Sequence, residues 1–183
     1  MKKMILIFCL FLPCAVWGQQ KMLSRNAHIH FISHTDIIDI EGQTHQAGSI
    51  INLENGEIVF AVPMKSFKFE LALAEDHFNE DYVESEKYPK ASFAGKIKNI
   101  SAFNISQTGV FEAEVEGTLI LHGQSRQIFV KASLEKMDEK WVGQCTFNIL
   151  LADYQIQIPN LVKDKVAPVI PVVIKAEYSL LNK

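Results

Sequence analysis

Alternation of apolar and polar side chains is the strongest pattern in this chain. Between residues 109 and 121 the odd positions are apolar or glycine, and three glutamates stand among the even ones. The same two-residue period runs through 126–134, 141–151 and 170–180. Side chains point alternately to the two faces of a strand, so each stretch predicts a β-strand with one buried face. Burial on one face only favours an antiparallel sheet.

The first half of the chain predicts further strands with a less regular pattern. Residues 27–31 and 58–62 alternate, and a stretch from about 36 to 53 changes face near Gly42, which is typical of a bulge. Short turns at 54–56, 122–123 and 138–140 separate the strands. About eight antiparallel strands result. Closure into a β-barrel would bury one face of each strand and remove the sheet edges, so the predicted fold is an all-β, eight-stranded antiparallel barrel.

One stretch breaks the two-residue period. In HFNEDYVESEKYPK, Phe78 and Tyr82 lie four positions apart and would share one helical face, while the acidic residues between them would point to water. Pro89 ends this element, and the alternation resumes behind it. The pattern predicts one short helix near residues 72–84, between two strands. Such a helix either caps one mouth of the barrel or is a plain crossover that seals its end.

The N-terminus has a different character. MKKMILIFCLFLPCAVWGQQ begins with two lysines, continues with an apolar run and places small residues at Val16 and Gly18. This is the pattern of a secretory signal peptide, and it is too short for a membrane span. We therefore expect residues 1–18 to be removed and residues 19–183 to form one exported domain. Pro13, directly before Cys14, favours soluble export over a lipid anchor on that cysteine.

Composition and candidate chemistry narrow the functional classes. Loss of Lys2 and Lys3 lowers the 18 basic residues to 16, against 21 acidic ones, a net charge of −5. Without a basic patch, nucleic acids and anionic lipid surfaces are poor partners. Cys145 is the one cysteine beyond the expected signal peptide, which excludes an internal disulfide. It falls on an apolar face with no base beside it, and this predicts an inert buried thiol.

Histidines near the N-terminus offer the one candidate for metal chemistry. His28 and His30 lie two apart, opposite the apolar face that holds Ile29, so they are expected to face water. A zinc site needs at least three protein ligands, and His34 would have to supply the third. The sequence predicts no catalytic residue and no cofactor.

Small residues occur among the large ones on the inward faces, at Gly95, Ala113, Gly117, Ala132, Gly143 and Ala176. They either leave a cavity or fit the bends and taper of a filled barrel. A cavity would have an aliphatic and aromatic wall and would take an apolar chain. The residues expected to line it are Phe60, Phe78, Tyr82, Phe93, Ile97, Phe111, Ala113, Val115, Gly117, Leu119, Phe147, Ile149, Ile174, Ala176 and Tyr178.

Two motifs resemble those of a known family. The segment EDHFNEDYVESEKYPKASFAGKI (75–97) resembles the helix and following YP-x-x-x-F strand of the YceI-like family, through Tyr88, Pro89 and Phe93. The segment EGTLILHGQSRQI (116–128) is similar to the family's G-x-L-x-x-x-G hairpin, through Gly117, Leu119 and Gly123. The likeness extends from about residue 24 to 181, although residues 34–42 match the family poorly.

The resemblance implies a bacterial, periplasmic or secreted lipocalin-like barrel that binds a polyisoprenoid or another long amphiphile. The expected partner is thus a long-chain apolar small molecule (an isoprenoid lipid, a quinone tail or a fatty acyl chain) held in the lumen. Which of these it is, and the oligomeric state, stay open. Two alternatives also stay open: a metal-dependent enzyme that uses His28, His30 and His34, and a structural or adhesive barrel with a filled core.

Overall fold

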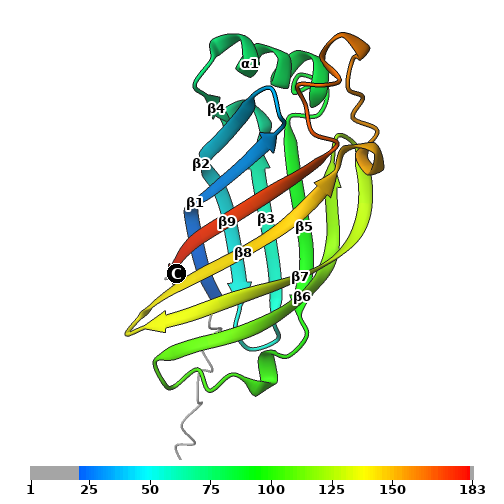
Figure 1. The fold of residues 1–183 in the computed structure, drawn as a ribbon. Helices are drawn as coiled ribbons and strands as arrows, with labels where there is room; N and C mark the ends of the chain where they lie inside the picture. The colour runs from blue at the N-terminus through cyan, green and yellow to red at the C-terminus, as the bar shows by residue number, and fades with distance from the viewer. Residues whose placement is uncertain (1–20, 182–183) are drawn as a thin grey trace, which may run out of the picture.

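The computed structural model describes residues 21–181, and the expected signal peptide at residues 1–18 lies outside this range. Within it, one antiparallel sheet has nine strands: β1 (Lys21–His34), β2 (Asp39–Asn52), β3 (Glu57–Pro63), β4 (Lys68–Phe69), β5 (Lys90–Ile97), β6 (Gly109–Leu121), β7 (Gln124–Met137), β8 (Lys140–Leu150) and β9 (Val169–Leu180). Their order is β1-β9-β8-β7-β6-β5-β3-β2-β4, and β1 also pairs with β2 (Figure 1). Eight strands therefore close into the predicted barrel, and the two-residue β4 adds to the edge of β2.

Helical structure is confined to short segments between strands. The helix α1 (Ala72–His77) continues into a π-helical turn, η2 (Phe78–Tyr82). Together these two elements confirm the helix predicted near residues 72–84. Four 3₁₀ turns accompany them in the described chain: η1 (Met64–Ser66), η3 (Ile100–Ala102), η4 (Leu151–Tyr154) and η5 (Asn160–Val162). Among residues 21–181, no helix is long and apolar enough to cross a membrane.

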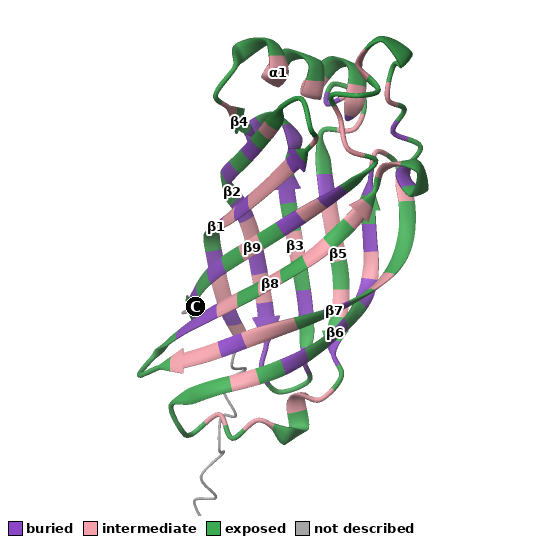
Figure 2. Cartoon of the chain, viewed as in Figure 1, coloured by how far each residue is buried: buried purple, intermediate pink, exposed green. Residues whose placement is uncertain are grey.

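The two ends of the barrel differ. At the end that carries α1, which we call the helix end, lie the β1–β2 turn, the β6–β7 turn and the loop between β8 and β9 (Figure 1). At the opposite end, aromatic rings fill the interior: Phe111 stacks on Phe103 with ring centroids 5.0 Å apart and lies 5.7 Å from Trp141. Buried residues follow the inner faces of the strands, and the helix end is mostly exposed or half-buried (Figure 2). The barrel is closed at one end by its own side chains.

The face change predicted near Gly42 lies further along β2. Buried positions run through Gly42 and Thr44 and then shift to Ala47, with the matching irregularity in β1 between Ala27 and Ile29. The prediction of a face change at Gly42 was wrong, because this glycine instead makes room for a neighbouring aromatic ring. A Cβ at Gly42 would lie 2.5 Å from the Phe31 ring, so its absence lets that ring lie on the backbone.

Candidate functional site

A cavity of about 450 Å³ lies inside the barrel and reaches the helix end. Small-molecule sites commonly have volumes of about 300–1,000 Å³. On β6 its wall runs from Ala113 to Leu121. With a rise of about 3.3 Å per residue and a strand tilt of about 40°, this corresponds to a depth of about 20 Å. The cavity is therefore long enough for an extended chain.

The wall is mostly apolar, and two of the polar side chains in it, Tyr178 and Ser33, are paired with protein atoms. The Tyr178 hydroxyl and Ser49 Oγ share a buried hydrogen bond of 2.8 Å, and burial raises the pKa of Tyr178 above its ordinary value. Near the mouth, Ser33 Oγ accepts a hydrogen bond of 2.9 Å from the Ala167 N–H. These groups offer a ligand little polar recognition, so the wall favours apolar molecules of suitable shape.

Most residues expected to line the cavity do lie in its wall: Phe60, Phe78, Tyr82, Phe93, Ile97, Ala113, Val115, Leu119, Phe147, Ile149, Ile174, Ala176 and Tyr178. Phe111 and Gly117 do not. Phe111 belongs to the aromatic cluster at the opposite end, and the space beside Gly117 is taken by Phe93, whose ring would lie 2.7 Å from a Cβ there. Whether the wall residues contact a ligand stays a prediction.

The small inward residues serve both purposes that the sequence left open. Phe93 lies across Gly95 and Gly117, so these glycines accommodate a ring and add no free volume. In contrast, Ala132 and Cys145 line the cavity and are only half-buried, as expected beside empty space. The barrel is thus filled at the opposite end and hollow toward the helix end, which argues against the alternative of a filled core.

The residues that carry the motif likeness pack against one another. The Tyr88 ring lies over Gly123, where a Cβ would be 2.6 Å from it, and meets the His122 ring edge-on with centroids 4.6 Å apart. Gly123 also has a φ of +70°, a conformation that favours glycine. Together with Phe93 over Gly117, these contacts fasten the start of β5 to the β6–β7 hairpin.

The segment from Leu71 to Glu84, which we call the cap, covers part of the mouth. Phe78 packs against the rings of Phe31, Phe67 and Phe69 at centroid distances of 5.7, 5.4 and 5.0 Å. The start of the cap is held by Glu75, whose Oε1 accepts a hydrogen bond of 2.5 Å from Lys68 Nζ. This bond lowers the pKa of Glu75, partly opposed by burial.

The end of the cap is tied to two other segments through His122. Its Nε2 lies 2.6 Å from Glu84 Oε2, and its Nδ1 donates to the Tyr154 carbonyl oxygen at 2.9 Å. The hydrogen bond from His122 is the main cause of a lowered pKa for Glu84. The sequence did not predict this bridge, because the three residues are far apart in the chain and have no shared pattern.

The loop between β8 and β9 also borders the cavity, and sequence reasoning missed it. Its members in the wall are Leu151, Ile156, Val162, Lys165 and Val166. They follow neither a two-residue nor a helical period, so no periodic signal marks them. The cap, this loop and the β1–β2 turn, which contributes Ile38 to the wall, together border the mouth.

Candidate metal ligands on β1 face outward and do not converge. His28 pairs with Gln43 at 3.2 Å, His30 with Glu41 at 3.3 Å and His34 with Asp39 at 2.5 Å. Within residues 21–181, no group of three or more His, Cys, Asp or Glu side chains is placed to hold a metal ion. The geometry therefore gives no support to a metal-dependent enzyme on these histidines.

Cys145 lies in the cavity wall, half-buried beside the free volume. Burial raises the pKa of its thiol to about 11. A thiol in this setting is a poor nucleophile, because the thiolate is the reactive form.

A sequence model of the YceI-like domain matches residues 21–178. The chain belongs to the YceI-like family. No curated protein sequence matches it. Among solved structures, the polyisoprenoid binding domain of Saccharophagus degradans, implicated in plant cell wall breakdown, is similar over 88% of this chain and 99% of its own, with 16% identity and a TM-score of 0.76.

Two other solved structures share the YceI-like fold. Burkholderia cenocepacia BcnA has 12% identity and a TM-score of 0.69, over 82% of this chain and 95% of its own. The Campylobacter jejuni YceI protein has 16% identity and a TM-score of 0.61, over 82% of this chain and 91% of its own. At these identities the likeness shows a common barrel and no more.

Proposed function

We propose that this YceI-like barrel binds an elongated apolar ligand in its lumen and carries it or shields it from water. The observation that carries the proposal is the cavity of about 450 Å³, walled by apolar side chains and open toward the helix end. The description of the Saccharophagus degradans neighbour as a polyisoprenoid binding domain supports the same ligand class. Isoprenoid lipids, quinone tails and fatty acyl chains all fit this description.

The affinity would come from burial. Each CH₂ group removed from water contributes about 0.8 kcal/mol, so ten of them contribute about 8 kcal/mol before the cost of immobilising the chain. A net gain of about 8 kcal/mol corresponds to a dissociation constant of about 1 μM, and the immobilisation cost is about 4 kcal/mol or more, so about fifteen buried CH₂ groups are needed for micromolar binding. Specificity would arise from the depth of the cavity and from the mouth, where His77 and Lys165 would meet a polar headgroup.

We propose that the protein acts outside the cytoplasm, in the periplasm or secreted, on the pattern of residues 1–18. A carrier of this kind needs no catalytic group.

The test is to fill the cavity. Ala132 lines the wall and is half-buried, so Ala132→Phe should place its ring in free volume. We expect the free energy of unfolding to change by less than about 1 kcal/mol, whereas a ring forced into a packed core costs about 1–3 kcal/mol. Binding of a fluorescent long-chain fatty acid should be lost. The control is Ala94→Phe, the same change at an exposed position on the outside of β5, which should bind normally.

Equal binding by both variants would show that the probe binds outside the lumen and would contradict the proposal. Unfolding of Ala132→Phe would show that the wall is packed at this point, which also contradicts it. If Ala132→Phe folds and loses binding, mass spectrometry of an organic extract of the protein from its native source would identify the ligand.

A further inference from the structure

We propose that the helix end docks on the surface of a lipid bilayer, with the aliphatic side chains around the mouth inserted among the lipids. The inference rests on the proposed function, since the bilayer would be where the barrel collects or delivers its ligand. Five side chains, which we call the rim, carry it. They are Ile37, Ile38, Leu71, Leu73 and Leu161, with exposed fractions of 61, 37, 57, 66 and 96%.

The rim is assembled from three segments that are distant in sequence. Ile37 and Ile38 lie in the β1–β2 turn, Leu71 and Leu73 at the start of the cap, and Leu161 in the β8–β9 loop. All three segments lie at the helix end (Figures 1 and 2). Large exposed apolar side chains that gather in one region mark an interaction surface.

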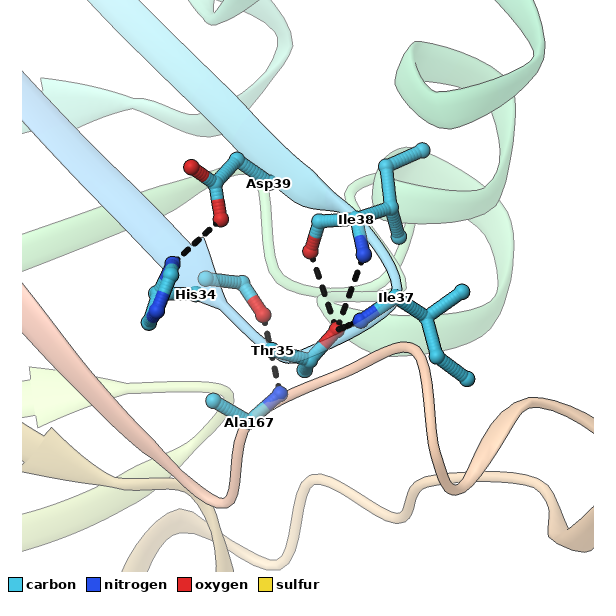
Figure 3. Close-up of polar contacts among 7 residues, drawn as sticks. His34, Thr35, Ile37, Ile38, Asp39 and Ala167 are labelled. Carbon is cyan, nitrogen blue, oxygen red and sulfur yellow. Dashed lines mark hydrogen bonds and ion pairs between the residues drawn. The ribbon is translucent and has the colours of Figure 1, made fainter.

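A set of hydrogen bonds fixes the conformation of the β1–β2 turn that carries the two isoleucines (Figure 3). Thr35 Oγ1 accepts from the N–H groups of Ile37 and Ile38 at 3.3 and 3.2 Å and donates to the Ile38 carbonyl at 3.0 Å. His34 and Asp39 close the base of the turn at 2.5 Å. The exposure of these side chains is therefore built into the turn.

A bilayer fits this surface because the rim is continuous with the cavity. Ile38, Leu71 and Leu73 are exposed on the outside and also line the cavity. An apolar chain that leaves a bilayer at this point could enter the lumen along aliphatic side chains without crossing water. Insertion of such side chains at the boundary between headgroups and acyl chains is how peripheral proteins bind membranes.

Charge beside the rim defines the kind of bilayer. Asp36 precedes the isoleucines and Asp76 lies within the cap, whereas Lys163 and Lys165 follow Leu161 with Asp164 between them. Both signs are present, and the described residues around the rim include no cluster of basic side chains that would recognise anionic lipids. The surface is therefore suited to zwitterionic lipid, with attachment driven by the apolar rim.

The experiment is flotation of the purified protein with phosphatidylcholine vesicles. We expect the wild type to float with the vesicles. The variant Ile37→Ser/Leu73→Ser/Leu161→Ser should partition at least about tenfold less, because three aliphatic side chains no longer enter the lipid. The control is Val59→Ser/Val110→Ser/Phe129→Ser, which removes three exposed apolar side chains away from the mouth and should float like the wild type.

A milder variant keeps the test valid if the triple variant does not fold. Leu161 is almost fully exposed, so Leu161→Ser should leave the melting temperature unchanged and still weaken attachment several-fold. Failure of the wild type to float would overturn the proposal. So would attachment that requires anionic lipid and disappears in high salt. Dimers that depend on the rim, without vesicle attachment, would overturn it in favour of a protein partner.

Docking and ligand binding can fail separately. Ala132→Phe, which blocks the lumen, should float like the wild type, because the rim is untouched. A wild type that binds the fatty acid probe and does not float would refute docking and leave the proposed function standing. A wild type that floats and does not take up the probe would refute the proposed function.

Discussion

Phe78 packs the middle of the cap against the aromatic rings at the helix end, so its removal tests whether the cap controls access to the cavity. Its ring packs against three others at centroid distances of 5.0–5.7 Å and lines the cavity from above. We predict that Phe78→Ala speeds the release of a bound long-chain probe by roughly 100-fold, on the magnitudes that burial and aromatic packing supply.

The magnitude follows from the contacts. Phe78 is half-buried, so its burial contributes about 1.5 kcal/mol, the lower end of the usual range. Three aromatic pairs add about 0.5 kcal/mol each, for a loss of about 3 kcal/mol. A factor of ten corresponds to about 1.4 kcal/mol, so the equilibrium between closed and open cap shifts by roughly 100-fold. The free energy of unfolding should fall by less than about 3 kcal/mol, because the variant can open its cap while the barrel stays folded. Unfolding from that open state breaks none of the Phe78 contacts.

Release is measured by stopped-flow displacement of the probe, and stability by urea unfolding followed through the fluorescence of buried Trp141. The control is Phe103→Ala, which removes another half-buried ring, stacked on Phe111 at the opposite end. It should lower stability and leave release unchanged. A stability loss of about 3 kcal/mol in Phe78→Ala with unchanged release would make the cap a fixed plug. Equal acceleration in both variants would place the exit elsewhere.

Two further predictions concern ionisable groups. With a pKa of about 11 against an ordinary value of 9.0, Cys145 should react with a thiol reagent at pH 8 about 100-fold more slowly than in the unfolded chain. Rapid labelling of the native protein would be inconsistent with its position in the wall. The pKa of Glu84 is lowered on folding, so its contribution to stability is present above about pH 4.5 and is lost as the pH falls through the folded value. The melting temperature of Glu84→Gln should lie below that of the wild type above about pH 4.5 and converge with it as the pH falls through the folded pKa of Glu84. A difference that stays constant with pH would show that the carboxylate is not responsible.

The strands and the cap could be predicted because each leaves a local periodic signal. Alternation placed Ala113, Val115 and Leu119 on the inner face, and the spacing of Phe78 and Tyr82 gave the orientation of the cap. These features depend on neighbours within a few positions, which the sequence displays directly. The same patterns fix the number of strands, and a one-sided burial pattern in eight strands leaves closure as the favourable arrangement.

The position of a side chain along the barrel axis leaves no periodic signal in the sequence. Phe111 and Ala113 have the same parity on β6, yet Ala113 borders the cavity and Phe111 packs into the closed end. Period-two alternation distinguishes in from out, and it does not distinguish a filled layer from a hollow one. The contact between His122 and Glu84 is equally hidden, since it joins positions 38 apart that become neighbours only when the barrel closes.

The contrast between features that a local sequence pattern predicts and features that it does not predict also applies to the proposed selection of a ligand. The residues that make the sequence resemble other YceI-like proteins, such as Tyr88 over Gly123 and Phe93 over Gly117, hold β5 to the β6–β7 hairpin. They specify the barrel, and of these four only Phe93 also lines the cavity. The mouth is bordered by the cap and the β8–β9 loop, and the apolar residues of the loop follow no motif. If the barrel binds a chain in its lumen as proposed, ligand preference would depend on these mouth segments, and two barrels with the same motif residues could select different chains.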